Sequence, residues 1–422
     1  MTTRENNRFA MAGQDWESLR GELVARRAAA HDMAWTSSRN LKASYNAGEE
    51  VARVGWDAYT LFNGDNFLYS TSLYPSLTEI GAEVVAMGLE LLDAPEGAGG
   101  TVTTGGTESI ILAVRTALNR ARNRRSFSGT PRIVMPGNAH AAFTKAAELM
   151  GIEPLRVPIR DFKADPEAMR HAITADTFML VGSAHAYPFG HVDDIAAISR
   201  LAEEHDLWLH VDACIGGFFL PFAVDLGHPV PDFDFTVPGV RSMSADFHKY
   251  GYTPRGASLL ALRDGEDRRY QGFKFASWQT GTFDTPSVAG SRPAGAVAGA
   301  WAVMKHLGRS GYRSLTEQTL AGKASIIRAF ERIEGIALCG APEGGVIGYR
   351  GTGDLDMHAV RDGLAARGWQ VATLVDPPGF QLLLNRTSGG IAEELAHDLR
   401  TAIGEVRTGK RTAPRSETGY GV

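Results

Sequence analysis

The 422-residue sequence is poor in cysteine and contains neither a long apolar run nor a basic block. Its two cysteines, Cys214 and Cys339, cannot form a disulfide framework, so we expect a reducing, cytoplasmic environment. No apolar run approaches the roughly 20 residues that span a bilayer, and the polar N-terminus lacks the apolar stretch of a secretion signal. Lys and Arg number 43 against 48 Asp and Glu, which disfavours the phosphate backbone of nucleic acid as a partner. We therefore expect neither nucleic acid nor a membrane anchor.

Glycine is abundant, at 48 residues, and many glycines stand beside polar residues where tight turns and ligand loops need them. From about residue 100, short apolar runs alternate with amphipathic stretches, which predicts βαβ units. The expected strands are residues 101–104, 132–135, 177–181, 208–211, 233–237 and 258–262. The expected helices are residues 107–124, 140–150, 166–173, 296–307 and 312–333. This pattern predicts an α/β fold with a mainly parallel sheet.

The same pattern divides the chain into four segments. The N-terminal segment is polar and helical, the second carries the strand and helix alternation, the third is a smaller α+β domain, and the last is a polar tail. We expect these segments to be a helical arm, a large domain, a small C-terminal domain and a flexible tail, at residues 1–60, 61–310, 311–410 and 411–422.

The first candidate for chemistry is the segment at residues 103–109, Thr-Thr-Gly-Gly-Thr-Glu-Ser, between an expected strand and an expected helix. Glycines such as Gly106 let a ligand approach the backbone, and the helix N-terminus offers unpaired N–H groups and a positive dipole end. The segment can therefore seat a phosphate group, although it is not a Walker loop. The alternative is an ordinary strand–helix turn with Thr107 as its cap.

The second candidate is the apolar run from Trp208 to Asp212, which ends in an acid followed by Cys214. An aspartate at the carboxyl end of a parallel strand lies where α/β sheets bind their ligands. Neighbouring His205, Asp206 and His210 raise a metal site as an alternative, but no third ligand has a recognisable spacing. We expect no metal. A helix N-cap on Asp212 remains the other interpretation.

The third candidate is Lys249, flanked by His248 and by Tyr250-Gly251 just before an apolar run. Partial burial lowers the pKa of a lysine, which leaves a neutral amine that can attack a carbonyl. A solvent-exposed surface lysine is the alternative.

Taken together, these three segments form the set of groups that pyridoxal 5'-phosphate needs. The phosphate takes the helix N-terminus, Asp212 keeps the pyridine nitrogen protonated and Lys249 forms the Schiff base. His140, at the expected start of a helix, can serve as an aromatic plate over the ring. We therefore expect pyridoxal 5'-phosphate as the cofactor, with a small-molecule amine or amino acid as the substrate.

Five motifs then resemble one known family. They read Thr-Gly-Gly-Thr-Glu-Ser-Ile at 104–110, His-Ala-Ala-Phe-Thr-Lys-Ala-Ala at 140–147, Val-Asp-Ala-Cys-Ile-Gly-Gly-Phe at 211–218, His-Lys-Tyr-Gly-Tyr-Thr-Pro-Arg-Gly at 248–256 and Ala-Gly-Ser-Arg-Pro at 289–293. This set is similar to that of the sphingosine-1-phosphate lyases, which belong to the group II decarboxylases among the fold-type I pyridoxal phosphate enzymes. The resemblance implies an aminotransferase-like large domain with a seven-stranded sheet.

The resemblance also implies a role for individual residues. Lys249 would hold the cofactor covalently, while Asp212 would pair with the pyridinium and His140 would stack on the ring. Tyr187 would lie near the substrate, unless it is only a packed aromatic residue. Four residues would bind the phosphate: Gly106, Thr107, His248 and Ser291. Ser291 would come from the neighbouring subunit of a homodimer.

The sequence departs from the family at the substrate end. Tyr74 stands where the lyases carry a histidine thought to hold the substrate phosphate, and Arg255 replaces a lysine six residues after Lys249. Arg386, after a small-domain strand, is a second cation that could bind a carboxylate, or else a surface arginine. We expect a small anionic amine with Arg255 as its main anchor.

Three functions follow from these residues. The first is retro-aldol cleavage of a β-hydroxy amine, with or without a phosphate group, and Cys214 after the aspartate favours it. The second is decarboxylation of an amino acid on the same scaffold, which Tyr74 and Arg386 favour. The third is a cofactor-binding dimer with little activity, which the presence of Lys249, Asp212 and His140 disfavours. Retro-aldol cleavage is our prediction.

Overall fold

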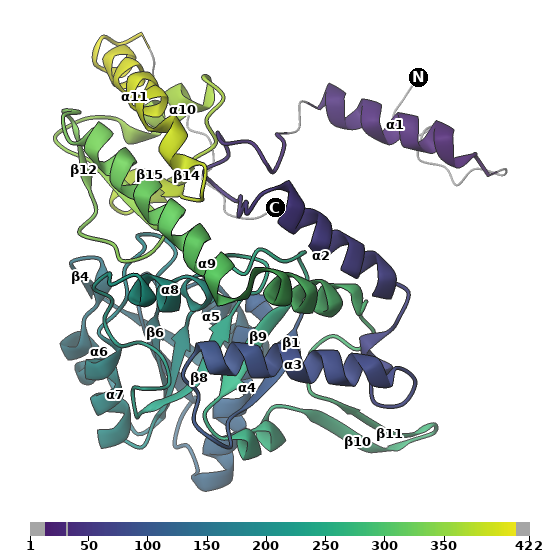
Figure 1. The fold of residues 1–422 in the computed structure, drawn as a ribbon. Coiled ribbons are helices and arrows are strands. Elements are labelled where there is room, and N and C mark those ends of the chain that lie inside the picture. The colour runs from purple at the N-terminus through teal and green to yellow at the C-terminus, as the bar shows by residue number, and fades with distance from the viewer. Residues whose placement is uncertain (1–12, 31–32, 411–422) are drawn as a thin grey trace, which may run out of the picture.

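The computed structural model describes residues 13–30 and 33–410, so the predicted tail at 411–422 lies outside the described residues. Its centre is a seven-stranded sheet in the order β1-β9-β8-β7-β6-β2-β3 (Figure 1). The strands of this sheet are β1 (Gly99–Thr103), β2 (Arg132–Pro136), β3 (Glu153–Val157), β6 (Thr177–Ser183), β7 (Trp208–Asp212), β8 (Val240–Ala245) and β9 (Ser258–Leu262). Only β9 runs against its neighbours, which confirms the mainly parallel α/β prediction.

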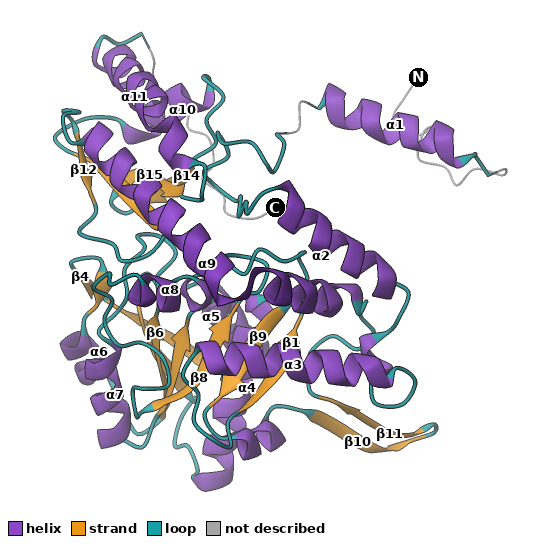
Figure 2. Cartoon of the chain, in the orientation of Figure 1, coloured by secondary structure: helices purple, strands orange, loops and turns teal. Residues whose placement is uncertain are grey.

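Helices cover both faces of this sheet, as Figure 2 shows. Side chains along one strand alternate between two cores: Ile133 and Met135 pack with α4 and α5, whereas Val134 packs in the opposite core. The helices of the N-terminal part and the large domain are α1 (Trp16–Ala29), α2 (Glu49–Phe62), α3 (Pro75–Leu91), α4 (Gly106–Arg124), α5 (Ala142–Met150), α6 (Pro166–Ala172), α7 (Ile195–Glu204) and α8 (Leu220–Asp225).

Local sequence chemistry fixes several helix ends. Asp165 caps α6, because its side chain accepts hydrogen bonds from the backbone N–H groups of Glu167 at 3.0 Å and Ala168 at 3.4 Å. Gly151 ends α5 in the left-handed conformation, with φ of 62°, which glycine adopts without steric penalty. Both ends are where the sequence predicts them.

One predicted strand is wrong. Residues 233–237 form a turn, and the strand of this region is β8, which begins at Val240. The Asp234 carboxylate accepts hydrogen bonds from the backbone N–H and the hydroxyl of Thr236, at 2.9 and 2.6 Å, which closes the turn. Phe233, Phe235 and Val237 are nevertheless buried, so the alternating apolar residues anchor a loop.

The small domain is built on a four-stranded antiparallel sheet in the order β12-β13-β15-β14. Its core contains Trp369, Phe380 and Leu395, all fully buried. Its elements are β12 (Ile336–Leu338), β13 (Val346–Gly351), α10 (Met357–Ala365), β14 (Ala372–Val375), β15 (Pro378–Leu383) and α11 (Ala392–Arg407). The long helix α9 (Gly295–Phe330) leads into it from the large domain, with a break at Gly308, where φ is 54°.

The remaining strands form two short hairpins, which the sequence analysis does not predict. One pairs β4 (Ile159–Arg160) with β5 (Lys163–Ala164), and the other pairs β10 (Phe273–Trp278) with β11 (Gly281–Thr285). The second hairpin extends from the body of the molecule and exposes large apolar side chains at its surface, namely Phe273, Phe275 and Trp278.

Two buried histidines should make the fold sensitive to acid. Burial lowers the pKa of His210 to about 4 and that of His185 to about 3, from 6.5 in the unfolded chain. The unfolded state therefore binds more protons below pH 6.5, so stability falls as the pH drops from 6.5 towards 4. Each histidine contributes about 1.4 kcal/mol per pH unit in that window. Thermal melts should show that His210→Gln loses less stability between pH 7 and pH 5 than the control His228→Gln, whose histidine is exposed. Equal losses of stability in the two variants would contradict this prediction.

Candidate active site

A cavity of about 490 Å³ opens at the carboxyl ends of the parallel strands. Turns after β1, β6 and β7, the loop after β8 and residues 42–45 of the N-terminal part all contribute to its lining. This is the position at which open α/β sheets bind ligands, because loops from neighbouring strands diverge there. The cavity gathers eight of the residues singled out in the sequence: Gly106, Thr107, His140, Tyr187, Asp212, His248, Lys249 and Arg255.

The turn between β1 and α4 has the features of an anion seat. Helix α4 begins at Gly106 after Gly105, and no side chain caps its N-terminus, so Thr107 is not the cap. A Cβ atom on Gly106 would lie 2.6 Å from Cys214 Sγ, so only glycine fits. The backbone N–H groups of the first helical turn lack partners within the helix and can bind an anion.

Glu108 holds this turn in place, and the sequence analysis did not single it out. Its carboxylate accepts hydrogen bonds from the Thr104 backbone N–H at 2.6 Å and hydroxyl at 2.7 Å. The other carboxylate oxygen accepts from the N–H groups of Val288 and Ala289, at 2.7 and 3.0 Å. Burial raises the pKa of Glu108, but these hydrogen bonds outweigh it and hold the pKa below its usual value. One carboxylate thus joins the anion seat to the loop that carries Ser291.

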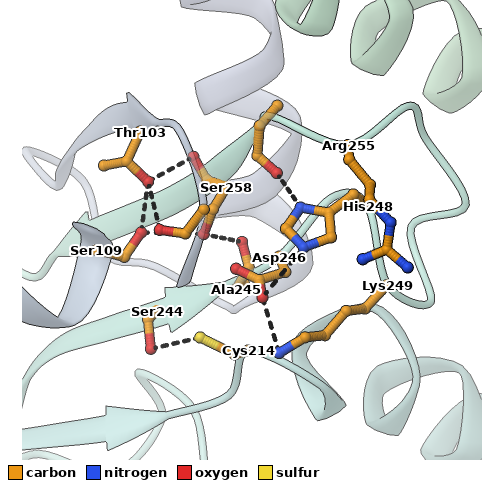
Figure 3. A network of polar contacts seen from close by, with 12 residues as sticks. Thr103, Ser109, Cys214, Ser244, Ala245, Asp246, His248, Lys249, Arg255 and Ser258 are labelled. Atoms are coloured by element: carbon orange, nitrogen blue, oxygen red, sulfur yellow. Dashed lines mark hydrogen bonds and ion pairs between the residues drawn. The ribbon is translucent and has the colours of Figure 1, made fainter. Parts of the chain in front are cut away.

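Lys249 is paired with an aspartate, as Figure 3 shows. Its Nζ lies 2.8 Å from Oδ2 of Asp246, which is 2% exposed. Burial by itself lowers the pKa of Lys249, but the charge of Asp246 outweighs burial and raises this pKa well above its usual value. This corrects the expectation of a lowered pKa, because that expectation took burial into account without the counter-ion.

His248 stands on the other side of Asp246. Its Nε2 lies 3.8 Å from Asp246 Oδ2, and its Nδ1 hydrogen-bonds the Ala257 carbonyl oxygen at 3.0 Å. Burial lowers the pKa of His248 despite the neighbouring carboxylate. Because the carbonyl can only accept, Nδ1 carries a proton, and the Nε2 edge is available to a ligand in the cavity.

Asp212 is fixed at the end of β7 by two hydrogen bonds. Its Oδ1 accepts from the backbone N–H of Cys214 at 3.1 Å and from the hydroxyl of Ser244 at 3.2 Å. Burial raises the pKa of the Cys214 thiol well above its usual value, so this side chain stays neutral beside the aspartate. The carboxylate is 8% exposed and borders the cavity, so it can act on a ligand as well as shape its own turn.

His140 presents a neutral ring to the same cavity. Its Nδ1 accepts a hydrogen bond from the Ala142 backbone N–H at 3.1 Å, which fixes the ring orientation at the start of α5. Burial lowers the pKa of His140, so the imidazole is neutral at pH 7. A neutral, oriented ring is suited to stacking on a flat aromatic ligand.

Three predicted residues lie outside the described lining of this cavity. Tyr74 precedes α3, and Arg386 lies beside Gly48, where a Cβ atom would meet its guanidinium at 3.3 Å. Ser291 is exposed and accepts a hydrogen bond from Asn66 Nδ2 at 2.9 Å. Arg255, by contrast, borders the cavity and donates from Nη2 to the Ala43 carbonyl at 3.2 Å.

The lining also contains residues that the sequence analysis missed, chiefly Tyr45, His185 and Asp246. Asp246 could have been found from its position three residues before Lys249. Tyr45 comes from the N-terminal part, far away in the sequence, and no local pattern marks it. In the described part of the chain, no cluster of histidine, cysteine or acidic residues is arranged to hold a metal ion.

The residues present fit pyridoxal 5'-phosphate. The glycine cradle and free helix N-terminus suit a phosphate, and Lys249 can supply an amine. Asp212 can supply a fixed carboxylate, and His140 a flat ring. These four kinds of group surround one cavity of sufficient volume.

Comparison with known proteins agrees with this fit. Residues 3–343 match the pyridoxal-dependent decarboxylase conserved domain. The chain is 37% identical to the sphingosine-1-phosphate lyase of Oryza sativa over 356 residues, which are 83% of this chain and 66% of the rice protein. It is 33% identical to the sphingosine-1-phosphate lyase of Dictyostelium discoideum, with 91% of this chain and 72% of that protein covered. The match thus spans slightly less than two thirds of the rice lyase.

Solved structures give the same result for the fold. The sphingosine-1-phosphate lyase of Burkholderia pseudomallei has a TM-score of 0.90 at 36% identity, covering 96% of this chain and 94% of that chain. A glutamate decarboxylase of Lactobacillus brevis has a TM-score of 0.79 at 23% identity, covering 96% and 97%. The second likeness supports the fold alone. None of the described helices is long and apolar enough to cross a membrane.

Proposed function

Because the chain belongs to the pyridoxal-dependent decarboxylase family, as a relative of the sphingosine-1-phosphate lyases, we propose that it binds pyridoxal 5'-phosphate on Lys249 and cleaves a β-hydroxy amine by a retro-aldol reaction. The observation that carries this proposal is the single cavity that joins Lys249, Asp212, His140 and the N-terminus of α4. The products are an aldehyde and a shorter amine.

The protein's own groups divide the work of this reaction. Bound pyridoxal phosphate supplies the electron sink for the bond that breaks. Asp212, fixed by Cys214 and Ser244, would supply the carboxylate that pairs with the ring nitrogen of the cofactor. His140 covers a flat ring without adding charge, and the N-terminus of α4 with His248 binds a phosphate.

The substrate is bound by groups at the mouth of the cavity. Tyr187 lines the cavity, and its backbone carbonyl accepts a hydrogen bond from Gln381 of β15, which ties its loop to the small domain. We propose that the phenol of Tyr187 binds the β-hydroxyl group of the substrate. Arg255, a permanently charged fork at the rim, is assigned to an anionic substituent such as a phosphate.

A second cavity favours a substrate with an apolar chain over the small polar amine expected from the sequence. This cavity, of about 290 Å³, shares Tyr45, His248 and Arg255 with the first. Trp35 and Trp56 also line it, and both are about half exposed. Exposed aromatic surface beside an active site is suited to an acyl chain. The substrate proposed is therefore a phosphorylated long-chain β-hydroxy amine, as the names of the relatives suggest.

Amino acid decarboxylation is the alternative. Its argument from the sequence relied on Arg386, which lies outside the described lining of the cavity. Arg255 and Lys42 are the cavity-lining side chains that could bind a substrate carboxylate, and because Arg386 is not among them we rank decarboxylation second.

A panel of amines tests the proposed function. Sphingosine-1-phosphate, short phosphorylated β-hydroxy amines and amino acids would be added separately to the cofactor-loaded protein, and the visible absorption would be followed. We expect the long-chain phosphorylated amine to give the largest change. Trp56→Ala should raise its KM roughly tenfold without affecting short amines, because about 1.4 kcal/mol of apolar burial is lost. A response to amino acids alone, with release of carbon dioxide, would refute retro-aldol cleavage.

We also propose a homodimer with shared active sites. Ser291 is exposed on a loop that Glu108 fixes, and the β10–β11 hairpin exposes Phe273, Phe275 and Trp278 at 47–50%. Apolar surface of this kind is typical of subunit interfaces. Light scattering should give twice the mass of one chain, and Phe275→Glu should lower this mass, whereas the exposed small-domain control Val375→Glu should not. A wild-type monomer that retains full cofactor occupancy would contradict the shared site.

The free, buried Cys214 and Cys339 support a reducing, cytoplasmic location.

A further inference from the structure

Asp246 is the buried carboxylate that touches both halves of the proposed cofactor site. It directly follows β8, and Oδ2 pairs with Lys249 Nζ at 2.8 Å (Figure 3). The other oxygen, Oδ1, is buried and has no hydrogen-bond partner among the described residues. A Cβ atom placed on Gly106 would lie 2.9 Å from each of these oxygens. One carboxylate therefore faces the anion seat as well as the reactive amine.

The effect of a bound anion on the ion pair depends on whether Asp246 or Lys249 lies closer to it. The three atoms closest to the Cβ position of Gly106 are Cys214 Sγ and the two oxygens of Asp246, so Lys249 Nζ is farther than the carboxylate from this position at the first residue of α4. An anion bound at the N-terminus of α4 therefore repels Asp246 more strongly than it attracts the ammonium group of Lys249. A nearby like charge favours the protonated form of a carboxyl group.

Other groups around the pair do not replace Asp246. In the described part of the chain, Asp246 is the only carboxylate that forms an ion pair with Lys249. The titratable groups that interact electrostatically with the pair are Tyr45, His140, His185, Cys214 and His248. Asp212 acts in turn on His140 and Cys214, and Arg255 acts on His248. The buried histidines are neutral at pH 7, because burial lowers their pKa values.

We propose that Asp246 is a phosphate-triggered proton acceptor, which keeps Lys249 protonated and unreactive until a phosphate group occupies the N-terminus of α4. This inference rests on the cofactor site of the proposed function and adds a control on how that site is loaded. The ligand recognised is an aldehyde that carries a phosphate, and aldehydes without phosphate are rejected because they do not displace the proton. Asp246 is thus a catalytic residue for the loading step.

Lys249 Nζ transfers one proton to Asp246 Oδ2, and the neutral amine attacks the aldehyde carbon to form a carbon–nitrogen bond. The aldehyde oxygen leaves as water with the two remaining amine hydrogens, and Asp246 keeps the transferred proton. No oxidant or reductant is needed.

Supplying the cofactor in two pieces tests this inference. Cofactor-free protein would be mixed with pyridoxal, which has the aldehyde but no phosphate, in the presence or absence of inorganic phosphate. The readout is the rate of Lys249 modification, from absorption and from the mass of the borohydride-reduced peptide. We expect phosphate to accelerate the wild-type reaction at least tenfold at pH 7. No acceleration would overturn the proposal.

Asp246→Asn removes the acceptor and the counter-ion together. Lys249 is then buried without a partner, its amine is neutral at pH 7, and it should react with pyridoxal faster than wild type and at a rate that phosphate does not change. Retained acceleration in this variant would also overturn the proposal. The control is Asp234→Asn, which lies in a surface turn and should behave as wild type.

The pH profile of the wild type keeps the test valid if Asp246→Asn does not fold. With pyridoxal alone, the rate should rise with pH to beyond pH 10, whereas with phosphate it should level off at least one unit lower. If the pH profiles with and without phosphate superimpose, Asp246 is not a phosphate-triggered proton acceptor. Wild-type protein that does not take up pyridoxal 5'-phosphate on Lys249 at all would instead refute the proposed function, so the two failures are distinguishable.

Discussion

Lys249→Ala protein should purify without the visible absorption of a lysine-bound cofactor and should turn over no substrate. The substitution removes the amine, and Lys42 is the one other lysine in the described lining of the cavity. The fold should survive, because Lys249 contributes one ion pair and its partner Asp246 can become protonated when the counter-ion is lost. The measurement is absorption after dialysis against pyridoxal 5'-phosphate, followed by borohydride reduction and peptide mass analysis.

Lys249→Arg is the matched control for this experiment. Arginine keeps the positive charge beside Asp246 but does not act as a nucleophile, because it stays protonated. Both variants should be inactive, and Lys249→Arg should melt closer to wild type than Lys249→Ala. A cofactor adduct that forms on another residue in either variant, with turnover preserved, would show that Lys249 has been assigned the wrong role.

Asp212→Asn should reduce kcat by two to three orders of magnitude while the cofactor stays bound. The asparagine keeps the size of the side chain and can still accept hydrogen bonds from Cys214 and Ser244, so the loss of negative charge is the main change. Removing one fixed electrostatic group from an active site has effects of about this size. KM should change much less than kcat, because Asp212 acts on the ring and not on the substrate.

Ser244→Ala separates the charge of Asp212 from its positioning. This variant removes one hydrogen bond to the carboxylate and leaves the charge, so we expect roughly a tenfold loss at most. If Asp212→Asn and Ser244→Ala lowered kcat equally, orientation and not charge would explain the effect. Near-normal turnover of Asp212→Asn would contradict the electrostatic role altogether.

The sequence predicts most of the fold because its signals are local. The apolar runs of β2, β6, β7 and β9, and the capping residues Asp165 and Gly151, act within a few residues of themselves. The error at residues 233–237 arises because a loop can also bury alternate side chains, and the Asp234 turn decides the backbone there. The β10–β11 hairpin was missed because its exposed aromatic residues do not show a buried-strand pattern.

For the site, too, the residues with local sequence signals could be predicted and those without such signals could not. Asp212 could be predicted to border the site because it ends a parallel strand at the edge of the sheet where ligands bind. Lys249 was placed with it by the set of groups that pyridoxal phosphate needs. The raised pKa of Lys249 could not be predicted from the sequence, since it depends on the 2.8 Å contact with Asp246 across a turn. Tyr45 reaches the cavity from the N-terminal part, which no periodicity reveals. Ser291 is a prediction about a second subunit, so one chain does not test it.

Analysis of the reaction products is the decisive test of retro-aldol cleavage. Cofactor-loaded protein would be incubated with sphingosine-1-phosphate, and mass spectrometry would identify every carbon-containing product. Retro-aldol cleavage predicts one long-chain aldehyde and one phosphoethanolamine for each substrate molecule consumed, and neither product with Lys249→Arg. An unchanged substrate at full cofactor occupancy, or carbon dioxide and a decarboxylated amine from an amino acid in its place, would contradict it.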